Sequence, residues 1–256
     1  MPSALSGALR FAAYAYPPNA LGYCGPDAAH QLLEQVAAGV DDPDLRRLAR
    51  GFEGAWPYLE LIAAANGIRD PLDPRVVEAY WVGNALLDRV GPRLLGDSLE
   101  SRFRGRAGRS WARLAEAVPA GAVPHHSFHV LGIYPWVGLL REGRVDEPLH
   151  VLDRCRVRWG RVVELHGPRA VVASRPLVWD GRLLSLGAER PEEVLLRVDG
   201  LGLAGAVQVG DWCSLHWDWV CERLTPRQLA ALHRRTGDQL AVANGTPYPA
   251  PAAVLG

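Results

Sequence analysis

The residues best suited to chemistry in this chain are thiols and imidazoles in two separate regions. Cys155 begins the segment 155–163, and His216 lies further along the chain within residues 209–224. A thiolate is a soft, strongly donating ligand, and a neutral imidazole binds many of the same transition-metal ions. The two together form a ligand set for iron. They can meet if the strands that carry them lie side by side in a small closed sheet.

A second group of histidines follows Pro124 and comprises His125, His126 and His129. On a helix, His125 and His129 lie one turn apart, and His126 and His129 are three residues apart. A pair at this spacing could bind a metal ion or a haem. Histidines at this spacing also occur as capping or packing residues of helices. The sequence therefore allows either a metal or haem site or a structural role.

The other cysteines are scattered, with no CxxC pair, which argues against a structural zinc site or a disulfide scaffold. Strand alternation from His216 places Cys213 and Cys221 on the opposite face of one continuous strand, as packing residues. Cys24 lies in a turn before a helix, where amide dipoles could lower its pKa.

The two regions around Cys155 and His216 resemble the two ends of the HypC/HupF hydrogenase-maturation chaperones. Residues 155–163, CRVRWGRVV, are similar to the family's opening of a Cys, a short apolar stretch, Gly and Val. Residues 209–224, VGDWCSLHWDWVCERL, are similar to its closing Val-Gly-Asp-aromatic turn and an apolar strand with one His. The resemblance covers residues 155–240.

This resemblance implies that Cys155 and His216 hold iron as the Fe(CN)2CO fragment of a [NiFe]-hydrogenase site. The implied partners are a HypD-like iron–sulfur maturation protein and the hydrogenase large-subunit precursor. The turn of Gly210, Asp211 and Trp212 is the implied partner-binding element. The resemblance favours a metallochaperone over a turnover enzyme.

The chain departs from the family pattern at three places. The family's Cys usually follows the initiator Met, whereas Cys155 is internal. Trp159 stands where the family has Pro, and Trp217-Asp218-Trp219 replaces an apolar-Gly-aromatic continuation. A carrier must exchange its cargo, so we expect the Cys155 thiol and the His216 ring to converge at an accessible surface.

The first part of the chain has the periodicity and punctuation of helices. Asp42-Pro43 and Asp73-Pro74 are typical cap and first-turn pairs. Residues 94–118 predict a further helix. Residues 125–140 predict a buried helix bent at Pro135.

From residue 144 onwards, short segments rich in Val and Leu alternate with Gly, Pro or Asp turns, which predicts strands. The predicted strands are residues 149–152, 157–165, 170–176, 182–186, 194–198 and 212–220. Thr225-Pro226 opens a C-terminal helix. The predicted fold class is α+β: an all-helical domain (1–145), then a small OB-like β-barrel with a C-terminal helix and an extended tail (146–256).

Composition excludes several classes of function. All 28 basic residues are Arg, so lysine Schiff-base and P-loop chemistry are absent. The formal net charge is zero, which argues against nucleic-acid binding. No segment has the length of a membrane span and no charged leader precedes an apolar core, so we expect a cytoplasmic protein.

Two alternatives remain beside the chaperone. One is a metal- or haem-dependent enzyme whose helical domain supplies a diatomic ligand through His125, His126 or His129, with the barrel as docking module. The other is a plain interaction module built on the barrel, against which the neutral charge argues.

Overall fold

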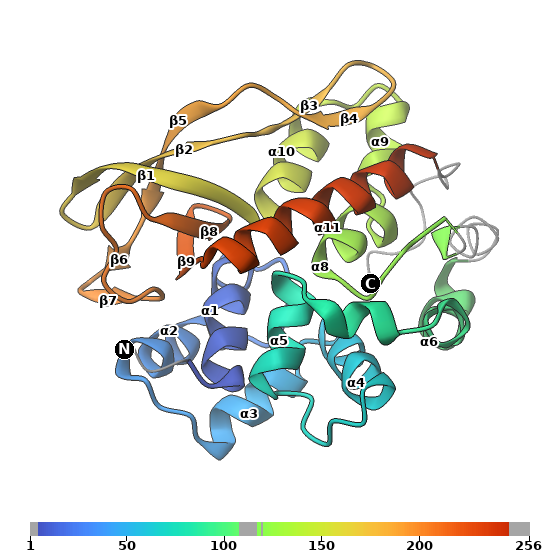
Figure 1. Ribbon diagram of the computed structural model, residues 1–256, viewed down its shortest axis with the longest axis horizontal. Helices are drawn as coiled ribbons and strands as arrows, with labels where there is room; N and C mark the ends of the chain where they lie inside the picture. The colour runs from blue at the N-terminus through green and yellow to red at the C-terminus, as the bar shows by residue number, and fades with distance from the viewer. Residues whose placement is uncertain (1–4, 108–116, 119, 246–256) are drawn as a thin grey trace.

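A computed structural model describes residues 5–107, 117–118 and 120–245, and the fold is α+β (Figure 1). Helical elements precede and follow the strands along the chain. They are α1 (Gly7–Ala20), α2 (Ala29–Ala38), α3 (Pro43–Arg50), α4 (Trp56–Ala65), α5 (Pro74–Trp81), η1 (Ala85–Arg89), α6 (Pro92–Ala107), α8 (His126–Phe128), η3 (His129–Ile133), α9 (Trp136–Arg141), α10 (Asp146–Cys155) and α11 (Pro226–Gly245).

Two helices begin at the predicted Asp-Pro pairs. The Asp42 side chain accepts a hydrogen bond from the Leu45 amide at the start of α3. The Asp73 side chain does the same for the Arg75 amide at the start of α5. Each carboxylate satisfies an amide that has no partner within the first turn and lies at the positive end of the helix.

Helix α1 was not among the predicted helices, although it lies at the centre of the helical layer. It packs on α2, α5 and the hairpin β8–β9. Phe11 and Tyr14 are fully buried, and nearly every residue of the helix is buried. A helix that is covered on all sides has no polar stripe, so its sequence carries no amphipathic period.

The main sheet contains β1 (Arg158–His166), β2 (Arg169–Ser174), β5 (Arg190–Leu195), β9 (Trp219–Arg223) and β8 (Trp212–His216), paired in that order. β8 pairs back onto β1, and every pair is antiparallel except β5 with β9. β5 and β9 are joined through one residue pair, Leu195 and Trp219. Two-stranded ladders add β3 (Leu177–Trp179) with β4 (Leu184–Leu186) and β6 (Arg197–Val198) with β7 (Leu201–Gly202).

The predicted strand at residues 149–152 is wrong, because these residues form the middle of α10. The helix has Asp146 and Glu147 in its first turn and Arg154 in its last, charges that suit the helix dipole. Its buried apolar positions have helical spacing at Pro148, Val151, Leu152 and Cys155. A window of four residues was too short to reveal that period.

The predicted single strand at residues 212–220 is wrong as well, because the chain reverses between β8 and β9. The reversal occurs at Trp217 and Asp218, and Trp217 has a positive φ of 51°. Turns of this kind usually contain Gly or Asn, which adopt positive φ at little cost. A Trp at this position gives no such sequence signal.

The predicted bent helix at residues 125–140 is confirmed in outline as α8, η3 and α9, with the break at Tyr134 and Pro135. The helix predicted at residues 94–118 is observed as α6 up to Ala107. Its continuation at 108–116 lies outside the described residues, as does the tail 246–256.

One hydrophobic core crosses the predicted domain boundary at residue 145. It joins Phe11 and Trp81 of the helical layer to Trp159 and Trp219 of the sheet and Leu232 of α11. In Figure 1, α11 runs diagonally across the molecule between the strands and the N-terminal helices. The two halves therefore bury apolar surface against each other.

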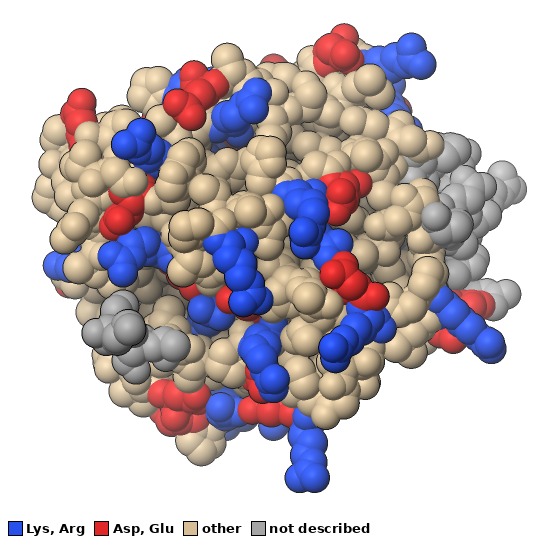
Figure 2. All heavy atoms as spheres, viewed as in Figure 1, with Lys and Arg blue, Asp and Glu red and all other residues tan. Residues whose placement is uncertain are grey.

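Basic and acidic side chains are interspersed over the face shown in Figure 2, without a single-sign field. In the part of the chain that the structure describes, no helix combines the length and apolarity needed to cross a bilayer.

Candidate metal centre

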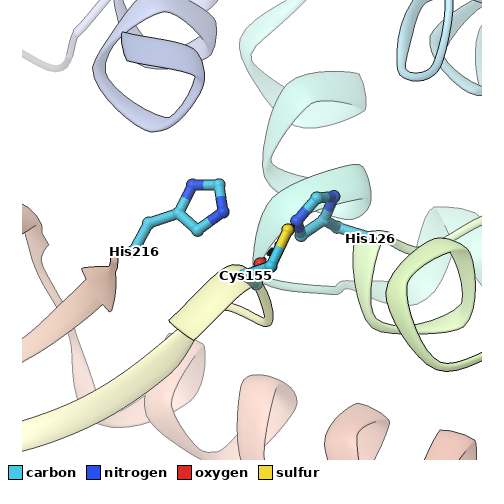
Figure 3. Close-up of side chains that lie close together, drawn as sticks. All are labelled: His126, Cys155 and His216. Atoms are coloured by element: carbon cyan, nitrogen blue, oxygen red, sulfur yellow. Dashed lines mark hydrogen bonds between the residues drawn. The ribbon is translucent and has the colours of Figure 1, made fainter. Parts of the chain in front are cut away.

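Three elements bring a thiol and two imidazoles together at the junction of the helices and the sheet. His126 is the first residue of α8, Cys155 the last of α10, and His216 the last of β8. One ligand atom from each side chain lies within 4.8 Å of the other two. Figure 3 shows the Cys155 sulfur beside the edge of the His126 ring, with the His216 ring facing both.

The His216 ring has the hydrogen-bond pattern of a metal ligand. Its Nδ1 lies 2.6 Å from the backbone oxygen of Tyr14 in α1. A carbonyl can only accept, so Nδ1 carries the proton and Nε2 keeps a lone pair. Among the described residues, this buried Nε2 has no hydrogen-bond partner. A ligating histidine is oriented in the same way, with one nitrogen donating to a carbonyl and the other free for the ion.

The His126 ring is held between two oxygen atoms. Its Nε2 lies 2.8 Å from the backbone oxygen of Cys155, and its Nδ1 lies 3.2 Å from the Tyr80 hydroxyl. In this arrangement Nε2 donates to the carbonyl, and the Tyr80 hydroxyl donates to Nδ1. The hydroxyl can also accept, so Nε2 becomes a ligand when the ring proton moves to Nδ1 and the ring turns the Nε2 lone pair away from the Cys155 carbonyl. The donor set therefore fits a transition-metal ion.

Burial keeps all three groups neutral without a metal. It lowers the pKa of His216 to about 4, and it places the pKa of His126 well below the usual value for histidine, with His216 adding to that shift. Burial also raises the pKa of the Cys155 thiol, and the nearby Cys24 adds to this effect. A metal ion would meet a His216 ring with a free lone pair, a His126 ring that must first give up a hydrogen bond, and a thiol that must lose its proton.

Hydrogen bonds from the end of α10 and the start of β1 fix the turn that follows His216. The Trp217 amide donates to the Arg154 carbonyl at 2.8 Å. The Arg158 guanidinium donates to the Trp217 carbonyl and to the Glu192 carboxylate. These contacts tie the peptide after His216 to the backbone beside Cys155. They also hold Trp217 at its positive φ.

The expected approach of Cys155 to His216 is found, but its expected position at an accessible surface is wrong. Cys155 is 7% exposed and His216 is fully buried. Helix α1 packs against β8 and β9, and Trp81 of α5 and His126 of α8 lie against the His216 ring at the end of β8. A partner can reach the thiol only if this cover moves.

The structure separates the three histidines that were proposed as a second site. The Nδ1 of His125 accepts a hydrogen bond from the Ser127 amide at 3.1 Å, as a helix cap. The His129 Nδ1 lies 3.4 Å from the Tyr58 hydroxyl. Within the described residues, His126, Cys155 and His216 form the only cluster of three or more potential ligands. His126 belongs with the thiol, and its neighbours do not.

The assignment of His126 to this cluster was missed by the sequence reasoning. One indication was present in the sequence, since His126 was already a candidate ligand. No spacing rule links residue 126 to residues 155 and 216, so the sequence could not group the three. Tertiary packing alone brings α8 against the end of α10.

The remaining cysteines lie outside the cluster. Cys213 packs inside the main sheet with Val162 and Val172, on the face opposite His216 as predicted. Cys221 was also predicted on the face opposite His216, but it packs in the core shared with the helices. The chain reverses at Trp217, so alternation along a single strand does not apply to Cys221. The expected lowering of the Cys24 pKa is wrong, since burial raises it to about 12.

The turn of Gly210, Asp211 and Trp212 lies at the opposite end of β8 from His216. Gly210 has a positive φ of 95°, and the Asp211 carboxylate accepts from the Gln208 amide at 2.9 Å. Trp212 is half-buried. A role for this turn in partner binding remains a prediction.

Comparison with known proteins adds a family but no activity. Residues 3–249 match the model of a family of unknown function, DUF6390. No curated protein and no solved structure matches the chain. Because the match covers nearly the whole sequence, the chain belongs to the DUF6390 family.

Proposed function

We propose that this protein is an iron-binding accessory protein of [NiFe]-hydrogenase maturation. It would hold the Fe(CN)2CO fragment as cargo through Cys155 and His216. The observation that carries the proposal is the convergence of the Cys155 thiol and the His216 ring, the two residues singled out by the resemblance to the HypC/HupF chaperones. The closed order of strand pairing is compatible with the small OB-like barrel that this resemblance implies.

His126 would act as a third ligand that the resemblance does not include. It comes from the helical half, whereas His216 comes from the sheet, so the cargo would lie between the two halves. Three protein ligands on an octahedral ion leave positions for the two cyanide groups and the carbonyl group of the fragment. Release of the cargo would begin with loss of the His126 bond, because that ring has alternative partners in Tyr80 and the Cys155 carbonyl.

The proposed partners are a HypD-like protein that loads the fragment and a hydrogenase large-subunit precursor that receives it. Since the thiol is buried, transfer would require the helices over the end of β8 to move. The turn of Gly210, Asp211 and Trp212 would be a contact point for a partner, away from the cover over the metal centre.

The proposal is tested by anaerobic purification of the full chain together with a HypD-like partner. We expect about one iron atom per chain, together with cyanide and carbonyl infrared bands. Cys155→Ala should lose both signals, since the thiolate is the strongest donor of the set. Cys213→Ala is the matched control, because it removes another buried thiol, which lies outside the cluster. Bands of equal intensity in Cys155→Ala and the wild type would end the proposal.

A second candidate function is a metal-dependent enzyme that acts on a small molecule. It is favoured by the third protein ligand and by a cavity beside the cluster, because three ligands and an open position are the pattern of catalytic sites. Incubation of the iron-loaded chain with a hydrogenase precursor separates the two. A carrier transfers its iron to the precursor, whereas an enzyme retains it.

A further inference from the structure

A small cavity of about 80 Å³ lies against the metal-binding cluster. Its walls include His126 and Cys155 of the cluster, together with Trp81, Tyr134 and Cys24. The side chains around it are mostly aromatic and apolar, and none of its lining residues carries a carboxylate. A space of this size holds a molecule of only a few heavy atoms.

This cavity lies next to an open cleft of about 740 Å³ on the protein surface. Tyr23, Cys24, Gly54, His129 and Tyr134 line both. A Cβ at Gly54 would lie 3.3 Å from the Nε2 of His129, so a larger residue there would crowd the His129 ring. These shared residues make the cleft the entry route in the proposal that follows.

Trp81 presents an unused hydrogen-bond donor in this region. Its side chain is 3% exposed, and its Nε1 is buried without an acceptor anywhere in the described part of the chain. Its ring centroid lies 4.5 Å from that of His126 and 5.6 Å from that of His216. A buried N–H group without a partner is costly, and such groups are rare in native proteins. A donor of this kind beside a metal-binding cluster is suited to a ligand on the ion.

We propose that the cavity is a binding site for a small linear anion. One end of the anion occupies an open coordination position of the bound ion, and the other accepts a hydrogen bond from the Trp81 Nε1–H. The ion supplies the positive charge, and the indole supplies the donor. The narrow aromatic walls exclude larger or strongly hydrated anions. This inference rests on the metal centre of the proposed function, in the state in which the ion is held by the protein ligands alone. Once the cyanide and carbonyl groups are attached, an octahedral iron with three protein ligands has no open position.

The test uses the full chain loaded with Co²⁺, whose visible absorption reports a change of ligands, and azide as the probe. Azide should shift the spectrum of the wild type and saturate. Trp81→Phe removes the donor and should weaken azide binding about 10-fold or more, because a hydrogen bond to a charged group contributes about 1.5–3 kcal/mol. Trp136→Phe is the matched control: Trp136 lines the same cavity, and its replacement enlarges the cavity while retaining the Trp81 donor. Its azide affinity should stay within about threefold of the wild type, with cobalt content equal in all three proteins.

The two proposals fail in different ways. Cobalt bound in the wild type with no spectral response to azide, or equal azide affinities of Trp81→Phe and Trp136→Phe, would overturn the anion site alone. A wild-type chain that takes up no metal would overturn the metal centre, and the anion site with it.

Discussion

His216 has one ring nitrogen committed to the Tyr14 carbonyl and the other buried without a partner. The hydrogen bond selects the tautomer and the ring orientation, so the lone pair is in place before an ion arrives. The Cys155 thiol is protonated in the same environment, since burial raises its pKa. In the proposed function, metal binding would therefore require the Cys155 thiol to lose its proton.

We predict that metal binding releases about one proton at neutral pH. Both imidazoles are already neutral because burial lowers their pKa values, whereas the thiol must ionise to bind. The apparent affinity should rise about tenfold for each pH unit between roughly pH 6 and 8. Competition with a chelator of known pH dependence measures this slope. Cys213→Ala should keep the slope, and a wild-type affinity independent of pH would contradict the prediction.

At the scale of the elements, a buried ion network fixes the geometry around the cluster. Arg158 is 1% exposed and pairs with Glu192, which also pairs with Arg154 at 2.9 Å. The same guanidinium donates to the Trp217 carbonyl. The network thereby links α10, β1, β5 and the β8–β9 turn. Its function is positional, because a charge buried in this way must keep its partner.

We predict that Glu192→Gln destabilises the protein by about 3 kcal/mol, because it leaves the buried Arg158 charge without compensation. Glu193→Gln is the control. Glu193 pairs with Arg169 on the surface, where both side chains are 53% exposed, so its loss should cost less than about 1 kcal/mol. Urea unfolding of the metal-free variants measures both values. Similar losses for the two variants would refute the positional role of the network.

For the whole molecule, the important feature is the core shared between the helices and the sheet. Phe11, Trp81 and Trp219 belong to one apolar cluster, and the three candidate ligands come from both sides of it. Four histidines are buried in this interior, at positions 125, 126, 129 and 216. Folding must keep these rings uncharged, which makes stability sensitive to acid.

His129, which is not one of the three candidate ligands, provides a test of this sensitivity of stability to acid. Burial lowers its pKa to about 3, and Arg102 adds to this shift. Below about pH 6.5 the unfolded chain binds a proton at this ring that the folded chain does not. Stability should therefore fall as the pH decreases from about 6.5 towards 3, by up to about 1.4 kcal/mol per pH unit from this one group. His129→Phe should make the decrease shallower in urea unfolding of the metal-free protein at pH 7 and pH 5. An unchanged pH dependence would show that His129 is not held neutral by folding.

Local sequence signals predicted much of the secondary structure. The Asp-Pro caps of α3 and α5 and the strands β1 and β2 are determined by neighbouring residues, and all were expected. The errors occurred where distant contacts decide. Helix α1 has no polar face because other elements cover it on all sides. Trp217 turns the chain because Arg154 and Arg158 hold its backbone.

The candidate site, like the fold, was predicted in part from the sequence and decided in part by tertiary contacts. The amino-acid sequence determined which side chains can bind a metal, and it singled out Cys155 and His216 by their flanking residues. The tertiary structure alone decided that His126 joins them, that the cluster is buried, and that Trp81 lies beside it. Ligand type is a property of a residue, whereas distance and burial arise from the packing of α8, α10 and β8 through a common core.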